Sequence, residues 1–174
     1  MNIRQESKED LKDIFNLIKK AFEHEPLSDH KEQFLVERLR MSENFVPELS
    51  LVVETEGKVI GYILLTKIKI KNGKETFTSL ALAPVAVLPE YQKRGIGTAL
   101  IQYAHQQAMT LGFHSVVLLG HENYYPKFGY KKAGDFEIRL PFDVPDENCM
   151  AVELKENALQ NVSGVVEYPK EFYE

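Results

Sequence analysis

The chain of 174 residues contains little of several things that would point to particular classes of protein. Cys149 is its single cysteine, which excludes an internal disulfide and any metal cluster built from cysteines. The longest apolar runs are far shorter than the roughly 20 residues that a membrane helix needs, and the first residues are charged, so we expect neither a membrane helix nor a signal peptide. Positive charge is not in excess, because the net charge is −5, and no basic face for nucleic acid is indicated.

These absences favour a cytoplasmic protein without nucleic-acid or membrane partners. The chain also lacks a histidine metal site, since the intervals between His24, His30, His105 and His114 do not match the spacing of metal ligands. We expect these four to be surface or partly buried residues, and we predict no metal site.

With 44% hydrophobic residues, the chain suits one domain, residues 1–174, with a core of its own. Ser7 and Asp10 form a capping pair before a first helix, whose apolar face we predict from Leu11, Ile14, Phe15, Ile18 and Phe22. A second helix is predicted over residues 29–40, with Phe34, Leu35 and Leu39 facing inward.

Apolar runs predict strands at 51–54, 59–70, 76–87, 116–120, 136–140 and 150–154. A helix follows the third of them, and Gly112 is its predicted C-terminal stop. Asn72-Gly73 indicates a tight hairpin turn, and Pro84 inside a strand predicts a bulge or the end of pairing. Residues 159–173 are expected to be a tail packed on the sheet. The order predicts an α/β (α+β) fold with a mixed, mainly antiparallel sheet and helices on both faces.

The most informative segment is the predicted strand-to-helix connection. Apolar Val85-Ala86-Val87 leads into Gln92-Lys93-Arg94-Gly95-Ile96-Gly97-Thr98 and then into the long amphipathic helix. The first N–H groups of a helix have no partner within it, and the helix dipole favours an anion there. The two glycines let a ligand approach the backbone closely. The segment therefore predicts a pyrophosphate site.

Two further motifs add to this one. Residues 92–97 fit neither the P-loop pattern G-x-x-x-x-G-K-[ST] nor the dinucleotide-binding pattern G-x-G-x-x-G. They read Q-x-x-G-x-G. After the next predicted strand comes Tyr124-Tyr125-Pro126-Lys127-Phe128-Gly129-Tyr130. Over residues 83–130 this combination resembles the GNAT superfamily of N-acetyltransferases, and in particular its bacterial YhbS-like branch. Residues 131–174 would supply the C-terminal strands and the tail.

The resemblance implies a GNAT fold, with splayed strands at the cofactor site, and acetyl-CoA as cofactor. Main-chain groups of the strand would pair with the pantetheine arm, and the N–H groups of the loop would face the pyrophosphate. A backbone N–H of the strand would also stabilise the oxyanion. The residues implied in cofactor binding are Val85, Ala86, Val87, Gln92, Lys93, Arg94, Gly95, Ile96, Gly97 and Thr98.

The resemblance implies Tyr125 as the catalytic residue at the leaving thiolate, with Tyr124 as the alternative. A phenol has a reference pKa of about 10 and a thiol one of about 8.5, so complete proton transfer is uphill by about 2 kcal/mol. The tyrosine would therefore act mainly as a hydrogen-bond donor.

The acceptor amine must lose its proton, because an alkylamine is almost entirely charged at pH 7. His121, Glu122 and Glu54 are the candidate bases, with a solvated surface residue as the alternative for each, and the sequence does not name the base. The acceptor is an amine of a small molecule or a protein, and the acidic net charge favours a cationic one. The state could be monomer or homodimer. The competing hypothesis is an acyl-CoA-binding sensor that has lost catalysis.

Overall fold

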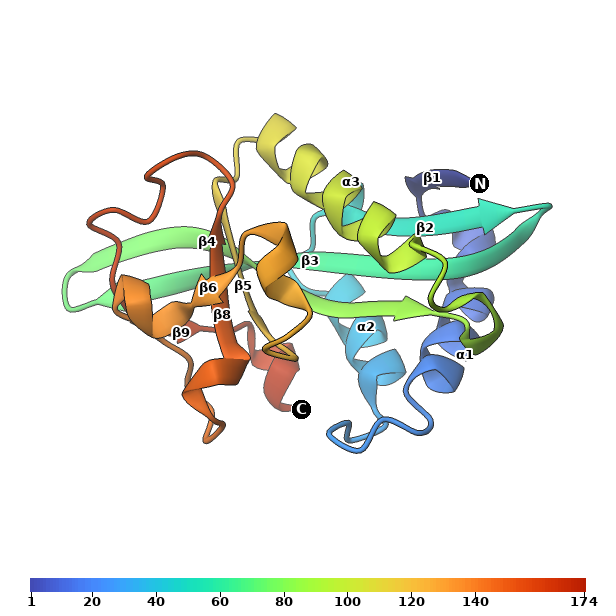
Figure 1. Cartoon of the computed structure of the whole chain (residues 1–174), viewed down its shortest axis with the longest axis horizontal. Helices are drawn as coiled ribbons and strands as arrows, with labels where there is room; N and C mark the ends of the chain where they lie inside the picture. The colour runs from blue at the N-terminus through green and yellow to red at the C-terminus, as the bar shows by residue number, and fades with distance from the viewer.

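One sheet of nine strands organises the molecule, and the computed structural model describes residues 1–174 (Figure 1). The strands are β1 (Asn2–Gln5), β2 (Ser50–Thr55), β3 (Lys58–Asn72), β4 (Glu75–Val87), β5 (Ser115–Leu119), β6 (Lys131–Lys132), β7 (Ile138–Arg139), β8 (Cys149–Glu153) and β9 (Gly164–Glu167). The α-helices are α1 (Leu11–Ala21), α2 (Glu32–Arg40) and α3 (Ile96–Thr110). None of the helices is long and apolar enough to cross a membrane.

The strands lie in the order β1-β2-β3-β4-β5-β8-β6, while β9 pairs with β3 and β7 pairs with β9. Two pairs, β4–β5 and β7–β9, are parallel, and the others are antiparallel. The long β3–β4 hairpin turns one residue later than the Asn72-Gly73 prediction, because Asn72 still pairs with Glu75 and the two loop residues are Gly73 and Lys74; Gly73 has a positive φ of +58°. The strand pairing confirms the predicted mixed, mainly antiparallel sheet.

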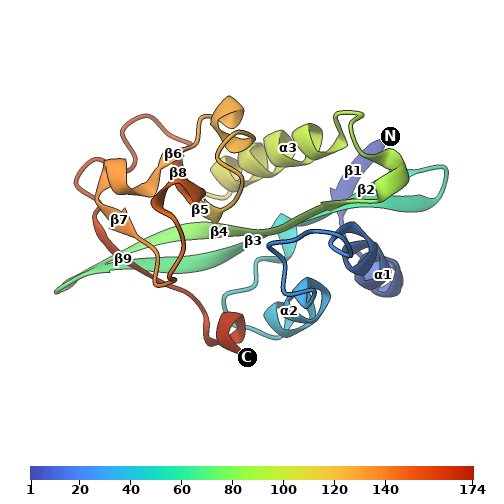
Figure 2. The same cartoon turned by 60° about the horizontal axis from the view of Figure 1, so that its bottom comes forward.

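Helices cover both faces of the sheet (Figure 2). α1 and α2 lie on one face, and α3 lies on the other. The close approach of α3 depends on Gly61 of β3, because a Cβ there would lie 3.1 Å from the side chains of both Ile96 and Leu100. The start of α3 is thereby pressed against the centre of the sheet, next to the end of β4.

The helix ends follow from local sequence. The Ser7 N–H donates to the Asp10 carboxylate (2.7 Å) in the predicted capping box before α1. At the end of α3, Gly112 has φ +89°, and the N–H of Phe113 donates to the carbonyl of Ala108 (2.9 Å). This is a Schellman motif, and it confirms the predicted stop at Gly112.

Some predicted boundaries and faces are wrong. α2 begins at Glu32 and buries Val36 and Leu39, whereas Phe34 is exposed. In α1, Leu17 is buried and Leu11 is exposed. These errors share one cause. The spacing of apolar residues along a helix does not specify the angle at which the helix packs on the sheet.

The C-terminal third differs further from the prediction. Residues 133–136 form a 3₁₀ turn, so that β7 keeps only Ile138–Arg139 of the strand predicted at 136–140. Within the predicted tail, β9 joins the sheet beside β3, at the pair Lys69↔Glu167. β1 is absent from the prediction because its four residues show no alternation of apolar and polar side chains. They form a strand by pairing with β2.

β4 and β5 are paired only at Leu80↔Val116 and Ala81↔Val117, and β4 then continues to Val87 without a partner on that side. The β3–β4 register shifts between Ile63 and Leu65, opposite Pro84, which confirms the predicted bulge. The bulge and the loss of pairing together open a gap between β4 and β5.

Candidate active site

The exposed edge of β4 forms one wall of the gap. The N–H of Leu88 donates to the carbonyl of Ile60 on β3 (2.9 Å). Because backbone groups alternate along a strand, those of Ala86 also face β3, while those of Val85 and Val87 face the gap. Of the three strand residues predicted to bind cofactor, the structure therefore turns Val85 and Val87 toward the gap and Ala86 away from it.

The start of α3 presents an unbroken row of free N–H groups beside this wall. No N–H in residues 93–98 donates a hydrogen bond within the protein, and the first bond of the helix comes from Ala99 to the carbonyl of Gly95 (3.0 Å). Lys93 and Gly95 have positive φ values of +63° and +81°, which turn the chain sharply into the helix. Such a row is a site for an anion.

The side chains of this loop support the backbone row. The Gln92 amide donates to the carbonyl of Val87 (3.0 Å), which ties the loop to the end of β4. The Arg94 guanidinium lies 5.4 Å from the centre of the Tyr91 ring, and Lys93 is exposed. Ile96 is buried in the core, so that only its backbone can serve a ligand. Both cations remain available to an anion at the row.

The two adjacent tyrosines reach different places. A Cβ on Gly97 would lie 3.0 Å from the hydroxyl of Tyr124, so this side chain extends to the start of α3. Tyr125 is 8% exposed, and its ring packs against Gly120 at the end of β5 and edge-on to Tyr130. The Tyr125 hydroxyl has no hydrogen-bond partner in the protein, although the ring is buried.

Burial sets the protonation of this aromatic cluster. It raises the pKa of Tyr125 well above its ordinary value, with a smaller contribution from neighbouring Tyr124. Tyr130 bonds to His105 Nε2 (2.8 Å), and burial lowers the pKa of His105 to about 4. Tyr125 is therefore a neutral donor across the physiological pH range, and His105 is a neutral structural partner.

The three candidate bases occupy different environments. Glu54 accepts a hydrogen bond from Arg4 Nε (2.7 Å), which lies in the ion-pair network at the capping box of α1. Glu122 is exposed and has no partner. His121 Nε2 lies 3.5 Å from Glu25 Oε1, in the loop between α1 and α2. Glu25 could not be identified from the sequence, because nothing in residues 22–31 indicates a contact so distant along the chain.

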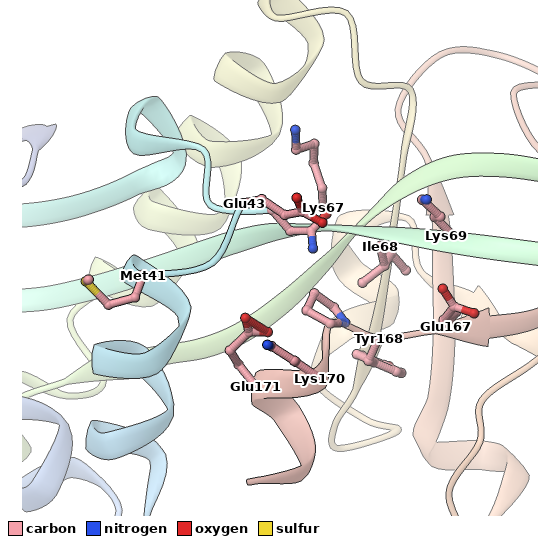
Figure 3. A pocket seen from close by; sticks show the side chains of 11 residues that line it. Met41, Glu43, Lys67, Ile68, Lys69, Glu167, Tyr168, Lys170 and Glu171 are labelled. Atoms are coloured by element: carbon pink, nitrogen blue, oxygen red, sulfur yellow. The ribbon is translucent and has the colours of Figure 1, made fainter.

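A cavity of about 540 Å³ lies elsewhere, against β3 between α2 and the C-terminal 3₁₀ turn Lys170–Tyr173 (Figure 3). The labelled side chains include Lys67, Lys69 and Lys170 together with Glu43, Glu167 and Glu171. The charges of the two signs are equal in number, and none of the predicted site residues lines this cavity. It is separate from the gap between β4 and β5.

Known proteins are similar to this chain in sequence and in fold. The model of the Acetyltransferase (GNAT) family matches residues 11–130. The uncharacterized N-acetyltransferase YjhQ of Escherichia coli is 37% identical over 142 residues, which are 81% of this chain and 76% of YjhQ. The crystal structure of the E. coli GNAT family N-acetyltransferase YhbS in complex with CoA is similar with a TM-score of 0.89 and 28% identity, covering 99% of this chain and 92% of that one. A Brucella melitensis GNAT family acetyltransferase in complex with acetyl-CoA gives a TM-score of 0.81 at 30% identity, covering 98% and 97%.

Proposed function

This chain belongs to the acetyltransferase (GNAT) family, and from that premise we propose how its residues transfer an acetyl group to a primary amine of a small molecule or a protein. It is an acetyl-CoA-dependent N-acetyltransferase, with acetyl-CoA as its cofactor. The observation that carries the proposal for the site is the row of unpartnered N–H groups at residues 93–98, beside the free edge of β4. When bound, acetyl-CoA supplies the activated acetyl group as a thioester.

The row of N–H groups binds the pyrophosphate, with Lys93 and Arg94 adding positive charge. The backbones of Val85 and Val87 have the free N–H and C=O groups that the amides of the pantetheine arm require. Gln92 and Thr98 flank this path, and Gly97 adds no side chain to it at a point where a Cβ would lie 3.0 Å from the Tyr124 hydroxyl. The free backbone donors and acceptors of β4 match those of the pantetheine amides, which supports binding of the arm alongside β4 in the manner of an added strand.

The chemical step needs two hydrogen-bond donors from this chain. A backbone N–H on the gap side of β4, at residues 85–87, stabilises the oxyanion that develops at the thioester carbonyl. Tyr125 donates to the leaving sulfur. Its raised pKa keeps the phenol protonated, so that it stabilises the thiolate by a hydrogen bond and does not surrender its proton completely.

Further features of the proposal concern the whole chain. We propose that residues 1–174 act as a single domain in the cytoplasm, as monomer or homodimer. The two core clusters support a single domain, because β3, β4, β5 and β8 contribute buried residues to both. The single cysteine, Cys149, agrees with a reducing compartment.

Calorimetry and a turnover assay test the function together. We expect acetyl-CoA and CoA to bind in the micromolar range and ATP to bind far more weakly, because ATP lacks the pantetheine arm that β4 receives. The acceptor panel is spermidine, a lysine-containing peptide and an aminoglycoside, with thiol release as the signal. Thiol release that depends on an acceptor supports the enzyme. Tight binding of acetyl-CoA without thiol release would instead favour a sensor built on the same fold.

A further inference from the structure

One contact between titratable side chains joins the α1–α2 loop to the loop that follows β5. Glu25 Oε1 lies 3.5 Å from His121 Nε2, and no ion pair between other side chains connects these two segments. Glu25 is about one-third exposed and His121 about two-thirds exposed, with side-chain values of 34% and 63%. The imidazole is thus both held by a carboxylate and open to an incoming ligand.

The backbone of His121 is fixed at the end of the gap. The preceding residue, Gly120, donates its N–H to the carbonyl of Asn148 (3.0 Å) and accepts from the Asn148 side-chain amide (3.0 Å). The carbonyl of His121 accepts from the N–H of Tyr124 (3.1 Å). Because the Tyr125 ring packs directly on Gly120, the same short loop carries His121 and the proposed donor to sulfur.

The other histidines are placed where they cannot serve the gap. His105 is bonded to Tyr130 within the core, and His114 lies at the opposite end of β5, where its carbonyl accepts from the N–H of Leu154 (2.8 Å). His24 is 92% exposed and lies 3.8 Å from the adjacent Glu23, and the ring of His30 bonds to the carbonyl of Phe22 (2.9 Å). His121 is therefore the one histidine at the open end of β5.

The charged groups around His121 favour a cation there. Glu25 faces it from the α1–α2 loop, and Glu122 follows it in its own loop. The 3₁₀ turn that ends at Asn148 carries Asp146 and Glu147, while Lys127 lies 4.1 Å from the centre of the Tyr124 ring. The loop of His121 and the segments that contact it thus carry four carboxylates against one ammonium group, and this balance favours an incoming ammonium ion.

We propose that His121 is the general base that deprotonates the acceptor amine, and that Glu25 is its positioning residue; this rests on the proposed function. The acceptor's ammonium group gives one proton to the imidazole, which passes it to solvent after the reaction. The neutral nitrogen attacks the thioester carbonyl carbon, the C–N bond forms and the C–S bond breaks. The nitrogen releases a second proton, and one proton ends on the sulfur of CoA. The amide and the thiol are the products.

The test compares His121→Asn with a matched control, His24→Asn, which removes an exposed histidine from an ion pair outside the gap. With the acceptor panel above, kcat/KM is measured from pH 6 to pH 10. Wild type and control should show a plateau on the acid side of the titration of the amine, because they take the acceptor in its ammonium form. His121→Asn should be about 10²-fold slower at pH 7 and should rise about tenfold per pH unit, because only the free amine then reacts. Glu25→Gln should lie between the two.

The outcomes separate this inference from the proposed function. Acetyl-CoA affinity should be unchanged in all three variants, which also shows that they fold. If wild type turns over an acceptor and His121→Asn keeps both its rate and its plateau, the base assignment is wrong and the acetyltransferase stands. If wild type binds acetyl-CoA but releases no thiol with any member of the panel, the proposed function fails, and the inference fails with it.

Discussion

Replacing Gly97 tests the cofactor site most directly, because the change should lower affinity for acetyl-CoA without lowering stability. Gly97 is the second residue of α3, and its N–H belongs to the unpartnered row. A carboxylate in Gly97→Glu would stand about 4 Å from a bound pyrophosphate charge. The repulsion is about 4 kcal/mol at an effective dielectric of 20 and about 1 kcal/mol in water. At this half-exposed position we take about 2 kcal/mol, which is a loss of roughly 30-fold in affinity before any clash.

The clash adds to this loss. A Cβ at Gly97 would lie 3.0 Å from the Tyr124 hydroxyl, which must move into the path of the cofactor or away from it. Gly97→Ala isolates this steric part and should cost about tenfold or less in affinity. The full loss in Gly97→Glu should therefore reach about 10²-fold, measured as the calorimetric dissociation constant of acetyl-CoA.

Stability should not fall with affinity. Glycine is a poor helix former by about 1 kcal/mol, and an acidic residue in the first turn of a helix is favourable by about 0.3–1 kcal/mol. The melting temperature of Gly97→Glu without ligand should thus equal or slightly exceed that of the wild type. A variant with wild-type stability and an acetyl-CoA affinity within threefold of wild type would refute the pyrophosphate site.

Three further predictions follow from the same structure. Tyr125→Phe should lower kcat about 10–10²-fold with acetyl-CoA affinity unchanged, whereas Tyr124→Phe should weaken binding instead; the reverse pattern in the thiol-release assay would exchange their roles. The hydrogen bond from the Arg4 guanidinium lowers the pKa of Asp10 to about 2. The ionised Asp10 therefore stabilises the folded protein fully above pH 5, and this contribution is lost as the pH falls toward 2. Urea unfolding should show a wild-type advantage over Asp10→Asn of about 2 kcal/mol at pH 6 that disappears near pH 2. Gly164→Ala should destabilise the protein by more than the roughly 1 kcal/mol expected for Gly73→Ala. Both glycines have a positive φ, but only at Gly164 would an added Cβ press on the backbone of β3. Equal losses of stability in thermal unfolding would show that β9 does not dock on β3 as described.

Local chemistry explains why much of the fold could be predicted from the sequence. The turn at Gly73, the stop at Gly112 and the bulge at Pro84 each depend on the φ preference or the missing donor of a single residue, so they appear at or within one residue of the place that the sequence indicates. The loop of residues 92–98 could be identified for the same reason. The role proposed for it depends on backbone N–H groups at the start of a helix, and a strand followed by glycines and a helix is enough to produce them.

Contacts between distant segments had to be seen in the tertiary structure. β1 and β9 are short strands whose residues carry no pattern of their own, and they become strands because β2 and β3 offer unpaired edges. The faces of α1 and α2 were partly mispredicted, since the packing angle of a helix is set by the surface beneath it.

The site shows the same division. The sequence by itself determined where free N–H groups begin a helix and that a tyrosine follows β5, because these features lie in continuous stretches of chain. Only the tertiary structure decided that Val85 and Val87 face an open gap, that Tyr124 reaches the start of α3 while Tyr125 is buried against β5, and that Glu25 meets His121. Each of these is a distance between segments far apart in the chain, and such distances are fixed by the packing of the sheet and its helices as a whole.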